Sequence, residues 1–173
     1  LTGNKLKTRA HNAVPEPLPH AQFAGMISRL DQYVGEIIKA IADKGLAENT
    51  LIIFTSDNGP HRENGGDPEF FNSSGEFRGI KRDLYEGGIR VAGGAVWPGE
   101  ITAGSRTGAV AITMDLFATA CEAARIKPPA SGIDGQSLLP VLRGKGELAA
   151  RDLIWVRREG GPGYEGRDYY AIR

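Results

Sequence analysis

Apolar and polar positions follow a helical period over residues 21–44. Apolar side chains recur there every three or four positions, which is the spacing of one face of an amphipathic helix. The members of this stripe are Phe23, Met26, Ile27, Leu30, Val34, Ile37, Ile38 and Ile41. Gly45 follows as a typical helix stop. We therefore predict a helix over 21–44, then a short link and a strand that begins at Thr50.

The run from Thr50 to Thr55 is short, apolar and rich in branched residues, which predicts a buried parallel strand. It leads into Ser-Asp-Asn-Gly-Pro at 56–60. Open α/β sheets hold ligands at the carboxyl ends of their strands, and the side-chain oxygens of Asp57 and Asn58 suit Ca²⁺ or Mg²⁺. The same residues are ordinary turn formers, and on this stretch alone an Asx turn is the simpler interpretation.

The rest of the chain shows weaker periodicity. Residues 59–80 are rich in Gly, Pro, Asn and Ser and predict a long loop. The pair Gly87-Gly88 is expected to break any helix before a strand over 89–97. The remaining expected elements are a helix over 113–126, a short helix near 137–142, and two short antiparallel strands at 153–156 and 169–172.

Composition narrows the function classes. The chain has 21 basic and 21 acidic residues, and its net charge is therefore zero. It lacks the excess of positive charge that is typical of nucleic-acid-binding proteins. Its one cysteine, Cys121, excludes an intrachain disulfide and any Cys/His zinc spacing. No apolar run approaches the ~18 residues of a membrane helix. His11 and His20 are interpreted as solvated loop residues.

Lys81 adds chemistry to the acidic strand end. An ammonium beside a divalent cation can hold a polyanionic group, because both charges stabilise its non-bridging oxygens. Sulfate and phosphate esters are such groups. Taken alone, Lys81 is most simply a surface lysine, and its order after Asp57, Asn58 and a long loop is what carries the interpretation.

Three strings in this order strongly resemble the sulfatase family. They are Phe54-Thr55-Ser56-Asp57-Asn58-Gly59, then Gly79-Ile80-Lys81-Arg82-Asp83-Leu84-Tyr85-Glu86-Gly87-Gly88-Ile89-Arg90-Val91, then Trp97-Pro98-Gly99. The resemblance implies an α/β fold of the alkaline-phosphatase superfamily type, with a mixed, mostly parallel sheet flanked by helices. It also implies hydrolysis of aryl or carbohydrate sulfate monoesters, a bound Ca²⁺ (or Mg²⁺), and a periplasmic or secreted location that the chain itself does not state.

Carried over position by position, the resemblance assigns roles to particular residues. Asp57 and Asn58 match metal ligands, and Lys81 matches a sulfate-contacting lysine. His61 is a candidate pocket-lining residue, although a surface loop histidine is the commoner case. The positions interpreted as structural are Glu86, Gly87, Gly88 and Arg90, with Arg90 expected to pair with Glu86.

The departures from the family pattern define what this chain lacks. The family nucleophile is a Cys or Ser matured to formylglycine within Cys/Ser-x-Pro-x-Arg, and no such string occurs here. The family's first acidic metal pair is also missing, and Ala92 stands where the family generally has Pro. We therefore expect an internal or C-terminal piece of a longer enzyme. Residues 1–127 would close its catalytic domain, and 128–173 would begin a small antiparallel C-terminal subdomain.

Two further expectations follow. This polypeptide alone is predicted to be inactive, since the formylglycine must come from the missing region. The alternatives are a phosphodiesterase or phosphonate hydrolase of the same superfamily, and a non-catalytic relative that binds a sulfated glycan.

Overall fold

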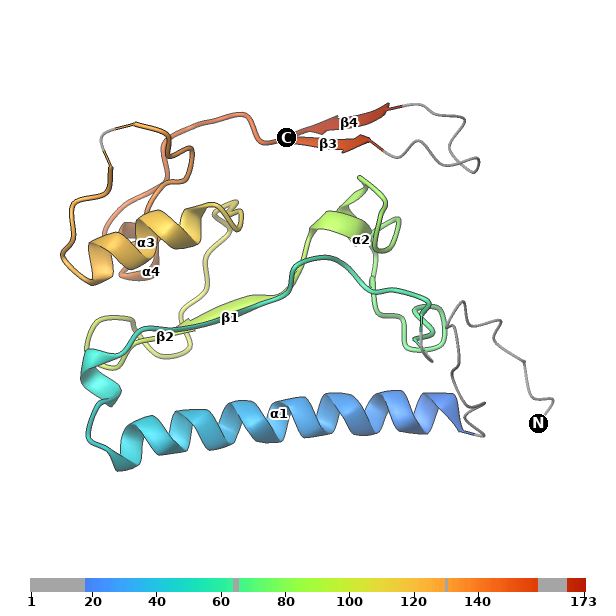
Figure 1. Cartoon of the computed structure of the whole chain (residues 1–173), viewed down its shortest axis with the longest axis horizontal. Helices are drawn as coiled ribbons and strands as arrows, with labels where there is room; N and C mark the ends of the chain where they lie inside the picture. Colours follow the sequence, from blue (N-terminus) through green and yellow to red (C-terminus); the bar gives the residue numbers. More distant parts are fainter. Residues whose placement is uncertain (1–17, 64–65, 130, 159–167) are drawn as a thin grey trace. The chain divides into compact units, whose positions relative to one another are not determined.

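The computed structural model describes residues 18–63, 66–129, 131–158 and 168–173 (Figure 1). The chain divides into two compact units, which we describe separately. One unit contains residues 1–37, 58–92 and 153–173, and the other contains residues 38–57 and 93–152. The elements in chain order are α1 (Pro19–Asp43), the 3₁₀ turn η1 (Ala47–Asn49), β1 (Ile52–Thr55), α2 (Glu86–Ile89), β2 (Gly93–Val96), α3 (Asp115–Ala123), α4 (Leu139–Leu142), β3 (Ile154–Arg158) and β4 (Asp168–Ile172).

The predicted long helix is confirmed as α1, the extended blue-to-cyan helix in Figure 1. It ends where the glycine signal placed the end. Gly45 has a positive φ of 68°, and its amide donates to the carbonyl of Ala42 at 2.8 Å. The apolar stripe of α1 is largely uncovered, because Met26 and Ile27 are about half exposed and no residue of the helix is buried.

In the second unit, β1 pairs with β2 in the antiparallel direction, with Ile52 opposite Val96 and Thr55 opposite Gly93. The indole Nε1 of Trp97, just after β2, donates to the carbonyl of Glu48 at 2.8 Å and closes this pair at one end. The expected parallel sheet is therefore not confirmed by the residues that the structure describes. The expected burial is also wrong, since Phe54 is 46% exposed. An apolar run indicates contact with other apolar groups, but it does not encode strand direction.

The core of the second unit lies around α3 and α4. Both helices confirm predicted elements. Asp115, Thr119 and Leu139 are fully buried. The Thr119 hydroxyl donates to the carbonyl of Asp115 at 2.7 Å and accepts from the amide of Leu138 at 2.9 Å. This hydroxyl therefore links α3 to the start of α4.

The first unit holds the long loop that follows Asn58, the single helical turn α2, and the β3–β4 hairpin. The two predicted C-terminal strands are confirmed, with Val156 opposite Tyr170 in the antiparallel register. A further backbone pair between Leu153 and Arg173, at 2.9 Å in both directions, extends the hairpin by one step. The long loop contains turns but no helix or strand in its described part, as predicted.

The glycine pair at 87–88 does not behave as the sequence predicted. Gly87-Gly88 was expected to break any helix, yet both residues lie inside α2. Tight packing outweighs their poor helix propensity, since a Cβ on Gly88 would lie 2.2 Å from the carbonyl oxygen of Asp83. The boundary near residue 128 stays a prediction. Among the described residues, the structure contains no helix long and apolar enough to cross a membrane.

Candidate functional site

The acidic strand end is built from β1 and the residues that follow it. Asp57 is exposed, and Asn58 is partly buried. The Asn58 side-chain amide donates to the carbonyl of Gly59 at 2.8 Å, so the chain turns immediately after the asparagine. This bond differs from an Asx turn, in which the side-chain oxygen accepts from a backbone amide two residues on, and the Asp57 residue that precedes it lies at the surface.

A cluster of glycines joins the segment after Asn58 to the segment that contains Lys81. The amide of Gly59 donates to the carbonyl of Gly88 at 2.9 Å. A Cβ on Gly59 would lie 1.9 Å from the carbonyl oxygen of Gly87, and one on Gly87 would lie 2.1 Å from that of Gly79. Only glycine permits backbones to approach this closely. The glycines of two separate sequence strings therefore have one physical explanation.

Lys81 lies beside the same turn. Its amide donates to the carbonyl of Pro60 at 2.7 Å, which places the backbone of Lys81 next to a residue only two positions after Asn58. Its ammonium is 3.7 Å from a carboxylate oxygen of Glu63, and the guanidinium of Arg82 is 3.1 Å from the other oxygen. The Lys81 side chain is 33% exposed, so its charge is accessible to an anion that competes with Glu63.

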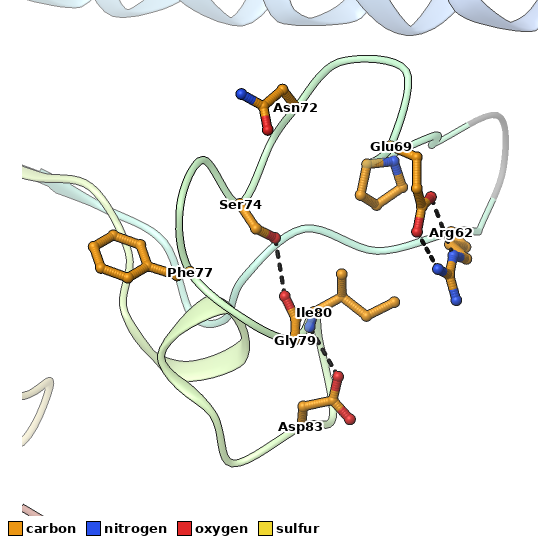
Figure 2. A pocket seen from close by; sticks show the side chains of 9 residues that line it. Arg62, Glu69, Asn72, Ser74, Phe77, Gly79, Ile80 and Asp83 are labelled. Carbon is orange, nitrogen blue, oxygen red and sulfur yellow. Dashed lines mark hydrogen bonds and ion pairs between the residues drawn. The ribbon is translucent and has the colours of Figure 1, made fainter.

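A tight turn holds Lys81 in place. The amide of Ile80 donates to the Asp83 carboxylate at 2.9 Å, and the amide of Asp83 donates to the carbonyl of Ile80 at 2.9 Å. Gly79 and Arg82 both have positive φ, at 92° and 83°. Figure 2 shows the Ile80–Asp83 bond together with the bond from the Ser74 hydroxyl to the carbonyl of Gly79, which is 2.9 Å long.

The long loop lines an open polar cavity of about 300 Å³ next to this turn (Figure 2). Its lining residues are Arg62, Pro68, Glu69, Asn72, Ser74, Phe77, Gly79, Ile80 and Asp83. Arg62 and Glu69 form an ion pair across one side of it. The hydrogen bond from Arg62 lowers the pKa of the Glu69 carboxyl, and the same pair raises the pKa of Arg62. The cavity thus offers charged and polar groups together with Phe77, over whose ring the guanidinium of Arg90 lies at 4.5 Å.

His20 corrects one sequence interpretation. It is not a solvated loop residue, because it lies in the first turn of α1 and its Nε2 is 2.9 Å from the Asp67 carboxylate. Its ring stacks on Phe70 with 3.9 Å between centroids. The pKa of Asp67 is lowered first by the amide of Phe70 and then by His20. No local signal links positions 20 and 67, so only the tertiary structure reveals this contact. His11 lies outside the described residues.

The other predicted site residues divide into two groups. Glu86 starts α2, and its carboxylate is 3.2 Å from the guanidinium of Arg90, so the expected pairing is present. The carboxylate of Glu86 also binds Arg173, a partner that the sequence did not suggest. His61 accepts a hydrogen bond at Nδ1 from the amide of Glu63 at 3.0 Å and does not line the cavity described above. Its proposed place in an active-site pocket stays a prediction.

The donor chemistry near Asn58 suits part of a hard-cation shell. Asp57 supplies a carboxylate and Asn58 an amide oxygen, and Ca²⁺ takes six to eight such ligands. Within the residues that the structure describes, no group of three or more His, Cys, Asp or Glu side chains could hold a metal ion. The oxygen donors of Asp57 and Asn58 are of the type that hard cations bind, and their role as metal ligands stays a prediction.

Comparison with known proteins identifies the class to which this arrangement belongs. The sulfatase family model matches residues 6–126. N-acetylgalactosamine-6-sulfatase of Homo sapiens is 36% identical over 137 residues, which cover 79% of this chain and 26% of that protein. Steryl-sulfatase of Rattus norvegicus is 37% identical over 152 residues, which cover 84% of this chain and 26% of that protein.

Solved structures agree with these relatives. Ps i-CgsB in complex with k-i-k-neocarrahexaose has a TM-score of 0.76 and 26% identity, covering 91% of this chain and 33% of that one. A protein in complex with its substrate D-glucosamine-2-N,6-O-disulfate has a TM-score of 0.67 and 26% identity, covering 85% of this chain and 28% of that one. These neighbours support an α/β fold. The chain belongs to the sulfatase family, and it spans about a quarter of the length of the curated relatives it matches.

Proposed function

We propose that the whole protein hydrolyses sulfate monoesters and that this chain supplies part of the site. One observation carries the proposal. The backbone bond from Lys81 to Pro60 joins the predicted sulfate-binding lysine to the turn that follows the predicted metal ligands. The names of the relatives, N-acetylgalactosamine-6-sulfatase and steryl-sulfatase, support the same reaction.

Each residue has a specific part in this proposal. The carboxylate of Asp57 and the amide oxygen of Asn58 are two ligands of a Ca²⁺ ion, with Mg²⁺ as the alternative. When bound, the ion stabilises negative charge on sulfate oxygens. Lys81 donates from its ammonium to a non-bridging sulfate oxygen and leaves Glu63 to do so, since Glu63 is its present ionic partner at 3.7 Å. The formylglycine nucleophile comes from a part of the protein outside this chain.

A carbohydrate sulfate is the substrate class to test first, with aryl sulfates as the alternative. Two of the solved relatives were determined with carbohydrates bound, a neocarrahexaose and a glucosamine disulfate. The polar cavity next to the Lys81 turn is lined by charged and amide side chains, among them Arg62 and Asn72, which can form hydrogen bonds with the hydroxyl and sulfate groups of a sugar. Export from the cytoplasm is part of the same proposal, and its test is activity in a periplasmic or culture fraction.

The experiment measures turnover of a sulfated monosaccharide and an aryl sulfate by the full-length protein. We expect Lys81→Ala to lower kcat/KM by about 100-fold, the size of effect found when one donor to a developing anion is removed. Asp57→Asn should lose activity that excess Ca²⁺ partly restores. Lys39→Ala is the matched control, because Lys39 lies on α1 and its exposed ammonium pairs with the exposed carboxylate of Asp43.

The outcomes separate the candidate functions. Unchanged turnover in Lys81→Ala would remove the lysine from the site and with it the observation on which the proposal rests. Preferential cleavage of phosphodiesters or phosphonates would assign the protein to the other branch of the superfamily. Tight glycan binding without turnover would indicate a non-catalytic relative. Residues 1–173 alone are expected to show no turnover.

A further inference from the structure

The β3–β4 hairpin reaches the segment that contains Lys81 through two arginines. Arg157 lies in β3, and its guanidinium donates to the backbone carbonyl of Arg82. Arg173 follows β4, and its guanidinium pairs with the carboxylate of Glu86. Both contacts lie within one compact unit, although 75 and 87 residues separate the partners. The hairpin therefore contacts both ends of the segment from Lys81 to Glu86.

The first contact is made at an unusual backbone position. Arg82 has a φ of 83°, a left-handed conformation that a non-glycine residue adopts only when its surroundings impose it. Two interactions act on this residue. Its side chain pairs with Glu63 at 3.1 Å, and its carbonyl accepts from Arg157. Because Arg82 directly follows Lys81, the direction in which the lysine side chain leaves the backbone depends on this conformation.

The second contact holds the other end of the segment. The carboxylate of Glu86 binds Arg90 within α2, at 3.2 Å, and Arg173 from the hairpin. The hydrogen bond from Arg173 is the main reason why the pKa of the Glu86 carboxyl lies below its usual value. The start of α2, and with it the Gly87-Gly88 contact to the turn after Asn58, is thus tied to the hairpin.

The hairpin itself is well suited to hold these two side chains. Arg157 is opposite Tyr169 in the ladder, and Arg173 is locked by two backbone bonds to Leu153. Leu153 is only 5% exposed, so Arg173 pairs with a buried position of the chain at this end of the hairpin. Both arginines are therefore presented from regular paired backbone and not from a loose tail.

We propose that Arg157 and Arg173 are positioning residues that hold the segment from Lys81 to Glu86 and thereby orient Lys81 for sulfate binding. The inference rests on the proposed function of Lys81. It assigns to the C-terminal hairpin a task in the active site, although neither arginine needs to touch the substrate.

The first test does not depend on activity. Hydrogen exchange of the amides in 79–88 is measured in the full-length protein and in the variants Arg157→Ala, Arg173→Ala and Arg158→Ala. Arg158 is the control, since it neighbours Arg157 on β3 but its 76% exposed side chain faces Asp168 of the same hairpin at 3.7 Å. We expect exchange of these amides to accelerate about 10-fold in the first two variants and to stay unchanged in the control. Exchange that is unchanged in all three overturns the proposal.

The second test distinguishes positioning from general stabilisation. Arg173→Ala is combined with Lys81→Ala, and kcat/KM is measured for all four proteins. If the arginine acts through the lysine, Arg173→Ala lowers kcat/KM by about 10-fold alone but by less than about 2-fold in the Lys81→Ala background. Arg173→Lys retains the charge opposite Glu86 and should recover part of the activity. Equal effects in both backgrounds overturn the proposal. A wild-type protein without sulfate-ester turnover rejects the proposed function, and the exchange measurement still decides whether the hairpin holds the segment.

Discussion

The buried ion pair between Asp115 and Arg151 should control the stability of the unit that contains α3. Asp115 is 0% exposed and Arg151 is 16% exposed. The guanidinium meets the carboxylate in a two-pronged contact, with both N–O distances at 2.6 Å. The carboxylate also accepts from the amides of Ile112 and Gln136 at 2.9 Å. Its four hydrogen bonds therefore join α3 to segments before and after it.

The informative change is Arg151→Met, which removes the charge and keeps much of the side-chain volume. It leaves a buried carboxylate with two amide donors and no cation. Removal of one partner from a buried pair costs about 3 to 5 kcal/mol. The matched control is Arg143→Met, which breaks the more exposed pair with Glu100 in the same unit, where exposures are 25% and 43%. Pairs near the surface are worth about 0 to 1 kcal/mol.

The assay is native-state hydrogen exchange of the α3 amides in the whole protein, which gives a local free energy of opening. We expect Arg151→Met to lower that free energy by at least 2 kcal/mol more than the control does, from the two ranges above. Adding Asp115→Asn to Arg151→Met should recover part of the loss, because no buried charge is then left without a cation. Equal effects of Arg151→Met and Arg143→Met would refute the assigned role of burial.

The same pair predicts an acid limit. Burial raises the pKa of Asp115, whereas the hydrogen bonds from Arg151 and from the two amides lower it. The lowering is the larger effect, so the pKa of Asp115 lies below its ordinary value of 3.8. A carboxyl whose pKa is lower in the folded state stabilises the fold above its unfolded pKa. This stabilisation is lost as the pH falls through the folded value. Exchange of the α3 amides should therefore accelerate below about pH 4, and much less so in Asp115→Asn.

Three further predictions concern residues of the first unit. Gly87→Ala should destabilise the folded protein by about 1 to 3 kcal/mol through overpacking and lower its thermal midpoint. Gly93→Ala is the control, because a Cβ at Gly93 meets open space, and equal midpoints of the two variants would contradict the glycine contact. The hydrogen bond from Arg173 lowers the pKa of the Glu86 carboxyl, so the contact between them should be present above the ordinary carboxyl pKa of 4.5 and weaken at lower pH. Hairpin amides should then exchange faster in acid, and a pH-independent contact would contradict this. His20→Ala should increase proteolysis within the long loop by about 10-fold, because the loop loses both the Asp67 contact and the stacking on Phe70; an unchanged cleavage rate would show that the loop is held elsewhere.

Local patterns predicted the elements that depend on neighbouring residues. The 3.6-residue period and Gly45 determine α1, because helix formation and its termination are decided within a few residues. The Leu153 and Tyr169 regions formed the expected antiparallel pair for a similar reason, since they are short, apolar and close along the chain. The three sequence strings that contain Asp57-Asn58, Lys81 and Trp97 were sufficient to indicate the family.

Strand direction and packing were beyond the reach of the same patterns. The apolar run at β1 pairs with β2 in the antiparallel direction, and hydrophobicity does not specify direction. Gly87-Gly88 lies inside a helical turn that packs against a distant position, since a Cβ on Gly59 would lie 1.9 Å from the carbonyl oxygen of Gly87. Propensity describes an isolated segment, whereas these outcomes depend on what packs against it.

The candidate site shows the same division. Sequence alone predicted which groups would carry the chemistry, since a carboxylate, an amide oxygen and an ammonium are identified by residue type. Only the tertiary structure decided what holds them. Lys81 bonds to Pro60, and Arg157 and Arg173 reach the Lys81 segment from the C-terminal hairpin. Contacts between residues 75 or more positions apart arise from chain topology, which no local pattern of residues records.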